Sequence, residues 1–218
     1  MNTRYSTKRN RQKSWLSQSA VIVFATVCYF ILPLSVLADV PLAQLEKDIG
    51  ELTAILDDKE YRDSHTKDEL KQKLIETAED RFNWEEIAKR SLGLYWKDRT
   101  EEEQKEFTLL LKDLLISSYL DKIIDNYSGE KILFDKEVLK GNRAYIEFRI
   151  INKVDTSISL GARMIQDKEQ WMIYDLVIEG VSSVKNYRVQ FYDIIRQSSY
   201  EELKKKLQEK VKALKEEK

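Results

Sequence analysis

Residues 143–178 read RAYIEFRIINKVDTSISLGARMIQDKEQWMIYDLVI, and their pattern predicts a β-sheet. Apolar and polar side chains alternate along it in three runs, and a period of two is typical of a β-strand with one buried face. The links between the runs are short, so consecutive strands are expected to pair antiparallel. The three runs are residues 144–150, 158–164 and 171–178.

A fourth, weaker strand is expected just before these runs, at residues 131–139. Asn142 fits the turn that follows it, and Lys168 with its neighbours fits the turn between the last two runs. The sequence therefore predicts an antiparallel meander of four strands.

Helical periodicity occupies the chain on both sides of this sheet. Pro41 suits the first turn of a helix over 41–57, and Thr66 and Glu69 have the spacing of a capping box before a helix over 67–82. Helices packed against one antiparallel sheet, with no internal repeat and no long linker, indicate a single α+β domain. The other predicted helices are 84–92, ended by Gly93, then 101–127, 182–197 and a last one from Ser199 to near the C-terminus.

Composition and charge restrict what this domain can bind. Of the 218 residues, 42% are hydrophobic and 34% are charged, which is a globular balance. The net charge of −1 conceals an uneven distribution of charge along the chain. Residues 1–38 contain five basic and no acidic residues, whereas residues 39–218 contain 32 basic and 38 acidic residues. That acidic balance argues against nucleic-acid binding, which requires a basic face, and against electrostatic adhesion to anionic membranes.

Residues 1–38 have the three-part pattern of a secretory signal peptide. A basic segment precedes the apolar run of residues 20–38, AVIVFATVCYFILPLSVLA, and the short side chains of Val36 and Ala38 predict cleavage after Ala38. The alternative is an uncleaved membrane anchor, since the run is close to the shortest length that spans a bilayer. Cys28, the only cysteine, lies in this run, so the rest of the chain forms no disulfide and no thiolate metal site.

Groups that could carry catalysis are scarce. His65 is the only histidine and lies in a polar loop, so the ligands of a zinc or iron site are missing, and no glycine-rich phosphate loop occurs. Asp175 and Glu179 interrupt the apolar strand WMIYDLVIEG, and a buried carboxylate can act as a general base. A structural role, as a partner of Arg188 or as a helix cap, is the expected one. We therefore predict that the protein is not an enzyme and holds no metal.

The predicted helix 101–127 is apolar around most of its circumference. Residues 109–116, LLLKDLLI, place apolar side chains on almost every side, whereas an ordinary amphipathic helix has one apolar stripe. This helix must therefore be covered on more than one side. Either the core is thick, or part of this apolar surface lines a cavity.

Two segments of the chain resemble the MlaC family of periplasmic phospholipid-binding proteins, also called toluene-tolerance auxiliary proteins of ABC transporters. Residues 92–127 read LGLYWKDRTEEEQKEFTLLLKDLLISSYLDKIIDNY, and residues 171–195 read WMIYDLVIEGVSSVKNYRVQFYDII. The tract D-x-x-I-E-G-V-S-x-V-x-N-Y-R-x-Q-F in the second segment is highly specific. The chain departs from the family at Ser198 and Ser199, where glycines are frequent, and in its long Lys/Glu-rich C-terminal helix.

The resemblance implies a curved four-stranded sheet and helices that form an NTF2-like cone around a deep apolar pocket. The pocket would hold phospholipid acyl chains as cargo, without a further cofactor. The family ferries lipid across the periplasm between an outer-membrane lipoprotein complex and an inner-membrane ABC transporter with an MCE-domain subunit. The resemblance thus divides the chain into a signal peptide (1–38), a phospholipid-binding domain (39–200) and a charged C-terminal helix extension (201–218).

One face of the sheet, together with the helices that cover it, is expected to line this lipid pocket. Each of the chosen residues could equally belong to a plain core. The expected lining residues are Ile146, Phe148, Ile150, Leu160, Ala162, Met164, Trp171, Ile173 and Val177 of the sheet and Leu111, Leu115, Tyr119, Val181, Val184 and Tyr187 of the helices and their approaches.

Two other functions stay open at this point. The first is an enzyme on an NTF2-like cone that uses Asp175 as a buried base. The second is a membrane-anchored adaptor that pairs through its C-terminal helix, where one narrow apolar stripe has the spacing of a short coiled coil. That stripe consists of Leu203, Leu207, Val211 and Leu214.

Overall fold

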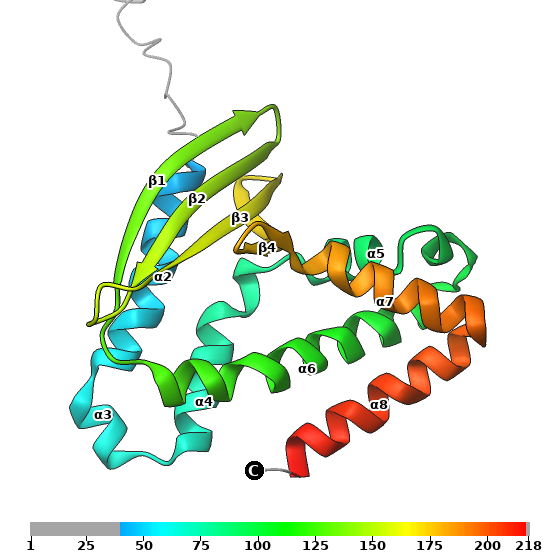
Figure 1. Cartoon of the computed structure of the whole chain (residues 1–218), viewed down its shortest axis with the longest axis horizontal. Coiled ribbons are helices and arrows are strands. Elements are labelled where there is room, and N and C mark those ends of the chain that lie inside the picture. The colour runs from blue at the N-terminus through cyan, green and yellow to red at the C-terminus, as the bar shows by residue number, and fades with distance from the viewer. Residues whose placement is uncertain (1–39, 217–218) are drawn as a thin grey trace, which may run out of the picture. The chain divides into compact units, whose positions relative to one another are not determined.

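The computed structural model describes residues 40–216, which run from helices through one sheet back to helices (Figure 1). The predicted signal peptide and its cleavage site lie outside these residues. None of the helices within 40–216 is both long and apolar enough to cross a membrane. The elements before the sheet are α2 (Pro41–Asp57), α3 (Lys59–Ser64), α4 (Lys67–Ala78), η1 (Glu79–Arg81), α5 (Trp84–Leu92), η2 (Gly93–Asp98) and α6 (Glu101–Asn126). The others are β1 (Lys131–Lys140), β2 (Arg143–Ile151), β3 (Ser157–Asp167), β4 (Gln170–Ile178), β5 (Val181–Ser182), α7 (Ser183–Gln197) and α8 (Tyr200–Glu216).

Side-chain caps start the helices where the sequence predicts them. The Thr66 hydroxyl accepts from the Glu69 backbone N–H at 3.2 Å, and the Glu69 carboxylate accepts from the Thr66 backbone N–H at 2.7 Å. The predicted helix over 67–82 ends early, because the Asn83 backbone N–H donates to the Ile173 carbonyl at 2.9 Å and Phe82 forms a bridge to β4. Helix α3 was not predicted, since its six residues carry no apolar repeat.

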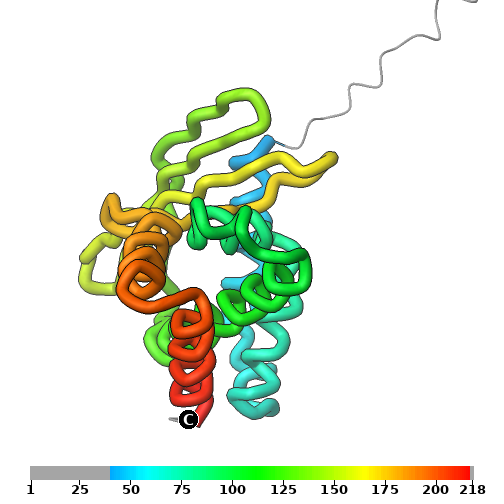
Figure 2. The backbone as a smooth tube through the Cα atoms, turned by 90° about the vertical axis from the view of Figure 1, so that its right-hand side faces the viewer, coloured from blue at the N-terminus to red at the C-terminus, as the bar shows by residue number. Residues whose placement is uncertain are grey.

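The sheet has five antiparallel strands in the order β1-β2-β3-β4-β5, so the predicted meander is confirmed and its strand number is corrected from four to five. The additional strand, β5, is only two residues long and pairs with the end of β4. Glu179 (φ 48°) and Gly180 (φ 78°) form the link between them, and positive φ at both residues is typical of a tight hairpin turn. Figure 2 shows the β1–β2 and β3–β4 hairpins diverging at their tips, as the twist of a sheet requires.

An irregularity in β4 changes which side chains share a face of the sheet. Met164 lies opposite Ile173, whereas the preceding Arg163 lies opposite Asp175, so Tyr174 is an extra residue in β4. Strict alternation would place Val177 on the same face as Ile173. The bulge moves Val177 to the other face, so the prediction that Val177 shares a face with the other sheet residues is wrong.

Helix α2 packs on the face of the sheet that carries the apolar side chains of β2 and β3. Leu45 is buried there against Ile146 and Met164, and the Gln44 side chain bonds both backbone groups of Trp171, at 2.6 and 3.0 Å. A second cluster joins α5, α6, α7 and α8 with Tyr174 of β4. A third joins α2 and α4, with residues from the C-terminal half of α6 packed against it. The core is therefore divided into three clusters.

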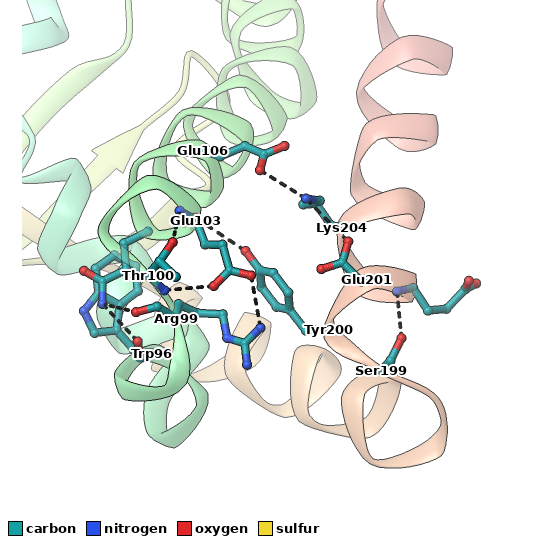
Figure 3. A network of polar contacts seen from close by, with 11 residues as sticks. Trp96, Arg99, Thr100, Glu103, Glu106, Ser199, Tyr200, Glu201 and Lys204 are labelled. Carbon is teal, nitrogen blue, oxygen red and sulfur yellow. Dashed lines mark hydrogen bonds and ion pairs between the residues drawn. The ribbon is translucent and has the colours of Figure 1, made fainter.

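Helix α8, which contains the predicted C-terminal extension, packs on the rest of the domain. Its apolar side chains Leu203, Leu207 and Val211 are buried in the cluster with α6, so α6 is covered on more than one side, as predicted. Lys204 also pairs with Glu106 of α6 at 3.1 Å (Figure 3). The stripe that the adaptor hypothesis requires for pairing is therefore buried within the domain itself.

Candidate functional site

Helices α6 and α7 are both connected to the sheet at the same end, where β2 ends and β3 begins. Four residues separate Asn126, the end of α6, from the first residue of β1, Lys131, which pairs with Ile151 at the end of β2. Helix α7 begins directly after β5, which pairs with the end of β4. Because the chain is so short at both connections, the C-terminal half of α6 and the first turns of α7 border the same end of the sheet (Figure 1).

This end of the sheet carries apolar side chains that the core leaves exposed or half-buried. The register places Ile150 opposite Ile158 and Ile178 opposite both Leu160 and Val181, so these five side chains share one face. Ile158, Ile178 and Val181 are 47, 40 and 60% exposed. We call these five residues the sheet-end patch.

The C-terminal half of α6, which borders the same end of the sheet (Figure 1), also carries exposed apolar side chains. Tyr119 and Ile123 of α6 are 44 and 52% exposed, and the half-buried Ile116 also lies outside the three core clusters. The Tyr119 hydroxyl is hydrogen-bonded to that of Tyr187, in the second turn of α7. Burial, followed by this hydrogen bond, raises the pKa of Tyr187, so this phenol stays protonated at neutral pH.

The predicted lining residues fall into two groups in the structure. The first group is exposed or half-buried, whereas the second is buried. The first group is Ile150, Leu160, Tyr119, Val181 and Tyr187, with Leu115 half-buried nearby on α6. The second is Leu111, Ile146, Phe148, Ala162, Met164, Trp171, Ile173, Val177 and Val184.

Sequence analysis missed Ile116, Ile123, Ile158 and Ile178 as members of this surface. Ile158 lies in the same alternating run as Leu160, and Ile123 lies one helical turn beyond Tyr119. Strand register would therefore have been enough to add Ile158 and Ile178 to the expected lining.

Two hollows within residues 40–216 are lined mainly by polar side chains, so neither is the expected apolar pocket. One, of about 550 Å³, lies beside α2 and includes Gln44, Asp48 and Arg81. Burial raises the pKa of Asp48 although its carboxylate lies 3.0 Å from Arg81 Nε, so desolvation outweighs the ion pair there. The other, of about 230 Å³, lies between β3, β4, α5 and α7.

Asp175, the candidate base, is buried, and both of its carboxylate oxygens accept hydrogen bonds. Its carboxylate accepts from Arg163 Nη1 at 2.7 Å, from the Ser182 hydroxyl at 2.6 Å and from the Val184 backbone N–H at 3.0 Å. It therefore caps α7, as the structural alternative predicts, although its ionic partner is Arg163 and not Arg188. Glu179 lies exposed in the β4–β5 turn, and the described residues contain no group of side chains that could hold a metal ion.

Comparison with known proteins identifies the family. The family described as "MlaC protein" matches residues 46–209. The chain belongs to the MlaC family. The intermembrane phospholipid transport system binding protein MlaC of Haemophilus influenzae is 24% identical over 133 residues, which cover 58% of this chain and 61% of that relative.

A solved structure confirms the fold. The phospholipid-binding protein from Ralstonia solanacearum, solved in complex with a phospholipid, superposes with a TM-score of 0.67 at 20% identity. The match covers 79% of this chain and 97% of that protein. The α+β arrangement of helices and a curved antiparallel sheet is thus that of a known phospholipid-binding protein.

Proposed function

We propose that this protein is a periplasmic phospholipid carrier that shields acyl chains on the sheet-end patch and the neighbouring faces of α6 and α7. The observation that carries the proposal is the exposed and half-buried apolar surface at the junction of these elements. Contiguous exposed apolar surface in a soluble domain is typical of a binding site. Membership of the MlaC family and the phospholipid bound to the Ralstonia protein support the choice of cargo.

Energetics explain why such a carrier is required. Burial of each methylene group is worth about 0.8 kcal/mol, so two acyl chains of about 16 carbons cost on the order of 25 kcal/mol to expose to water. Transfer from a bilayer to an apolar protein surface is nearly balanced, because both environments are apolar. The direction of transport can therefore come from the proteins with which the carrier docks.

The location and the partners follow from the same proposal. Cleavage after Ala38 would release residues 39–218 into the periplasm, with an excess of acidic residues that disfavours adhesion to anionic membranes. We infer that lipid is exchanged through docking on an inner-membrane MCE-domain ABC transporter and an outer-membrane lipoprotein complex. In this role the protein is a binding protein and not an enzyme.

Mass spectrometry of lipid extracted from the protein purified from the periplasm tests the proposal. Val181→Asp places a charge in the sheet-end patch, and desolvation of a carboxylate against acyl chains costs several kcal/mol. We expect at least about a tenfold loss of bound phospholipid. Val181 is 60% exposed, so the fold should survive, as circular dichroism will verify.

Val189→Asp is the matched control. Val189 is 56% exposed and lies two residues beyond Tyr187, on the opposite side of α7. This variant should retain its lipid. A wild-type protein without phospholipid would overturn the carrier function, and equal lipid loss in both variants would overturn the assigned site.

A further inference from the structure

The hollow of about 230 Å³ between β3, β4, α5 and α7 is lined by four cationic side chains and one carboxylate. Arg163, Asp175 and Ser182 contribute to it from the sheet. Their neighbours Ala162, Leu176 and Val181 point to the other face, which carries the sheet-end patch. This hollow is therefore separate from the proposed acyl-chain site. The helices contribute Arg90, Val184, Lys185 and Arg188, and β4 also contributes Tyr174.

Two of the four cations are held in place by carboxylates. Arg163 pairs with Asp175 at 2.7 Å, and Arg90 pairs with Glu86 while its guanidinium lies 4.3 Å from the centre of the Tyr174 ring. Asp175 already accepts three hydrogen bonds and has little capacity for a further cation. The hollow therefore contains arginine side chains whose positions are fixed before any ligand arrives.

The other two cations have no anionic partner. Within residues 40–216, neither the Lys185 ammonium nor the half-buried Arg188 guanidinium forms an ion pair or a side-chain hydrogen bond. The lining of the hollow thus holds four cations and one carboxylate, although residues 39–218 as a whole carry more acidic than basic residues.

This arrangement is unfavourable for stability on its own. Like charges around one hollow repel one another, and Lys185 lies in the first turn of α7, where the helix dipole disfavours a cation. The first turn of α7 contains no acidic residue that would offset it. Asp175, which caps α7, offsets part of this repulsion, but four cations around one carboxylate remain an excess of positive charge, and such an unfavourable arrangement is typical of a functional site.

We propose that this hollow binds a phosphate group. Guanidinium groups match the oxygens of a phosphate, and a lysine adds a point charge. The volume is below the roughly 300–1,000 Å³ of sites for drug-sized ligands, which suits a phosphate with few attached atoms. The group comes either from a phospholipid headgroup or from soluble phosphate.

Calorimetric titration of the mature protein with inorganic phosphate, at constant ionic strength in sodium chloride, tests the site. We expect saturable binding that weakens at least about tenfold in the double variant Lys185→Gln/Arg188→Gln. The control variant Lys205→Gln/Lys212→Gln removes the same charge from α8, where both lysines are more than two-thirds exposed, and should bind phosphate as the wild type does.

Competition with short-chain phosphatidylglycerol identifies the source of the phosphate. Displacement of inorganic phosphate by this lipid supports a headgroup, and retention of inorganic phosphate supports a soluble ligand. The proposal is overturned if phosphate binds no better than chloride, if both double variants lose binding equally, or if the hollow binds only an acidic peptide such as polyglutamate. Lipid content of the same samples is measured in parallel, so a failure here is distinguishable from a failure of the carrier function.

Discussion

Replacement of Asp175 by asparagine tests whether this carboxylate acts as a structural cap. An asparagine side chain has one acceptor oxygen, so it cannot satisfy Arg163, the Ser182 hydroxyl and the Val184 backbone N–H together. A lost charge-assisted hydrogen bond and an unsatisfied buried donor each cost about 1–3 kcal/mol. Arg163 is 42% exposed and regains water, which reduces the cost below the roughly 3–5 kcal/mol of a fully buried pair.

We therefore expect Asp175→Asn to lower the free energy of unfolding by about 2–4 kcal/mol, or the Tm by about 5–15 °C for a domain of this size. Urea denaturation at pH 7 measures the first quantity. Asp167→Asn, at the exposed end of β3, is the matched control and should change stability by less than about 0.5 kcal/mol. An equally small change for Asp175→Asn would refute the cap. Bound phospholipid should remain in the variant at temperatures where it is folded.

Two further predictions concern α8. Leu203→Ala removes a side chain with no exposed area and should lower the free energy of unfolding, measured by urea denaturation, by about 2–5 kcal/mol. Leu214→Ala, at a partly buried position, should lower it by less. If neither variant lost stability, α8 would be a detachable extension. Burial raises the pKa of Tyr200 to about 12, so the folded state holds this proton more tightly than the unfolded chain and stability falls as pH rises from about 10 towards 12. Tyr200→Phe should therefore lose less stability than the wild type between pH 9 and pH 11, and an unchanged pH slope would contradict the assignment.

The elements and the fold class could be predicted from the sequence, because their signals are local. Periods of two and of 3.6 residues located the long helices and strands, and Thr66 with Glu69 marked the start of α4. The tract that begins at Asp175 was sufficient to indicate the family, to which the chain belongs. The cap role of Asp175 was also among the expected alternatives, since a lone acid without a catalytic partner commonly has a structural function.

Which apolar side chains form the core and which stay uncovered depends on long-range packing. Alternation of apolar and polar residues shows which face of a strand a side chain is on, but not what packs against that face. Ile146 and Leu160 therefore look alike in the sequence, although Ile146 is buried under α2 and Leu160 is only half-buried. A bulge at Tyr174, which no periodicity reveals, moved Val177 to the other face. The pairing of Asp175 with Arg163, and the gathering of Arg90, Lys185 and Arg188 around it, likewise depend on long-range packing that brings α5, α7 and two strands together.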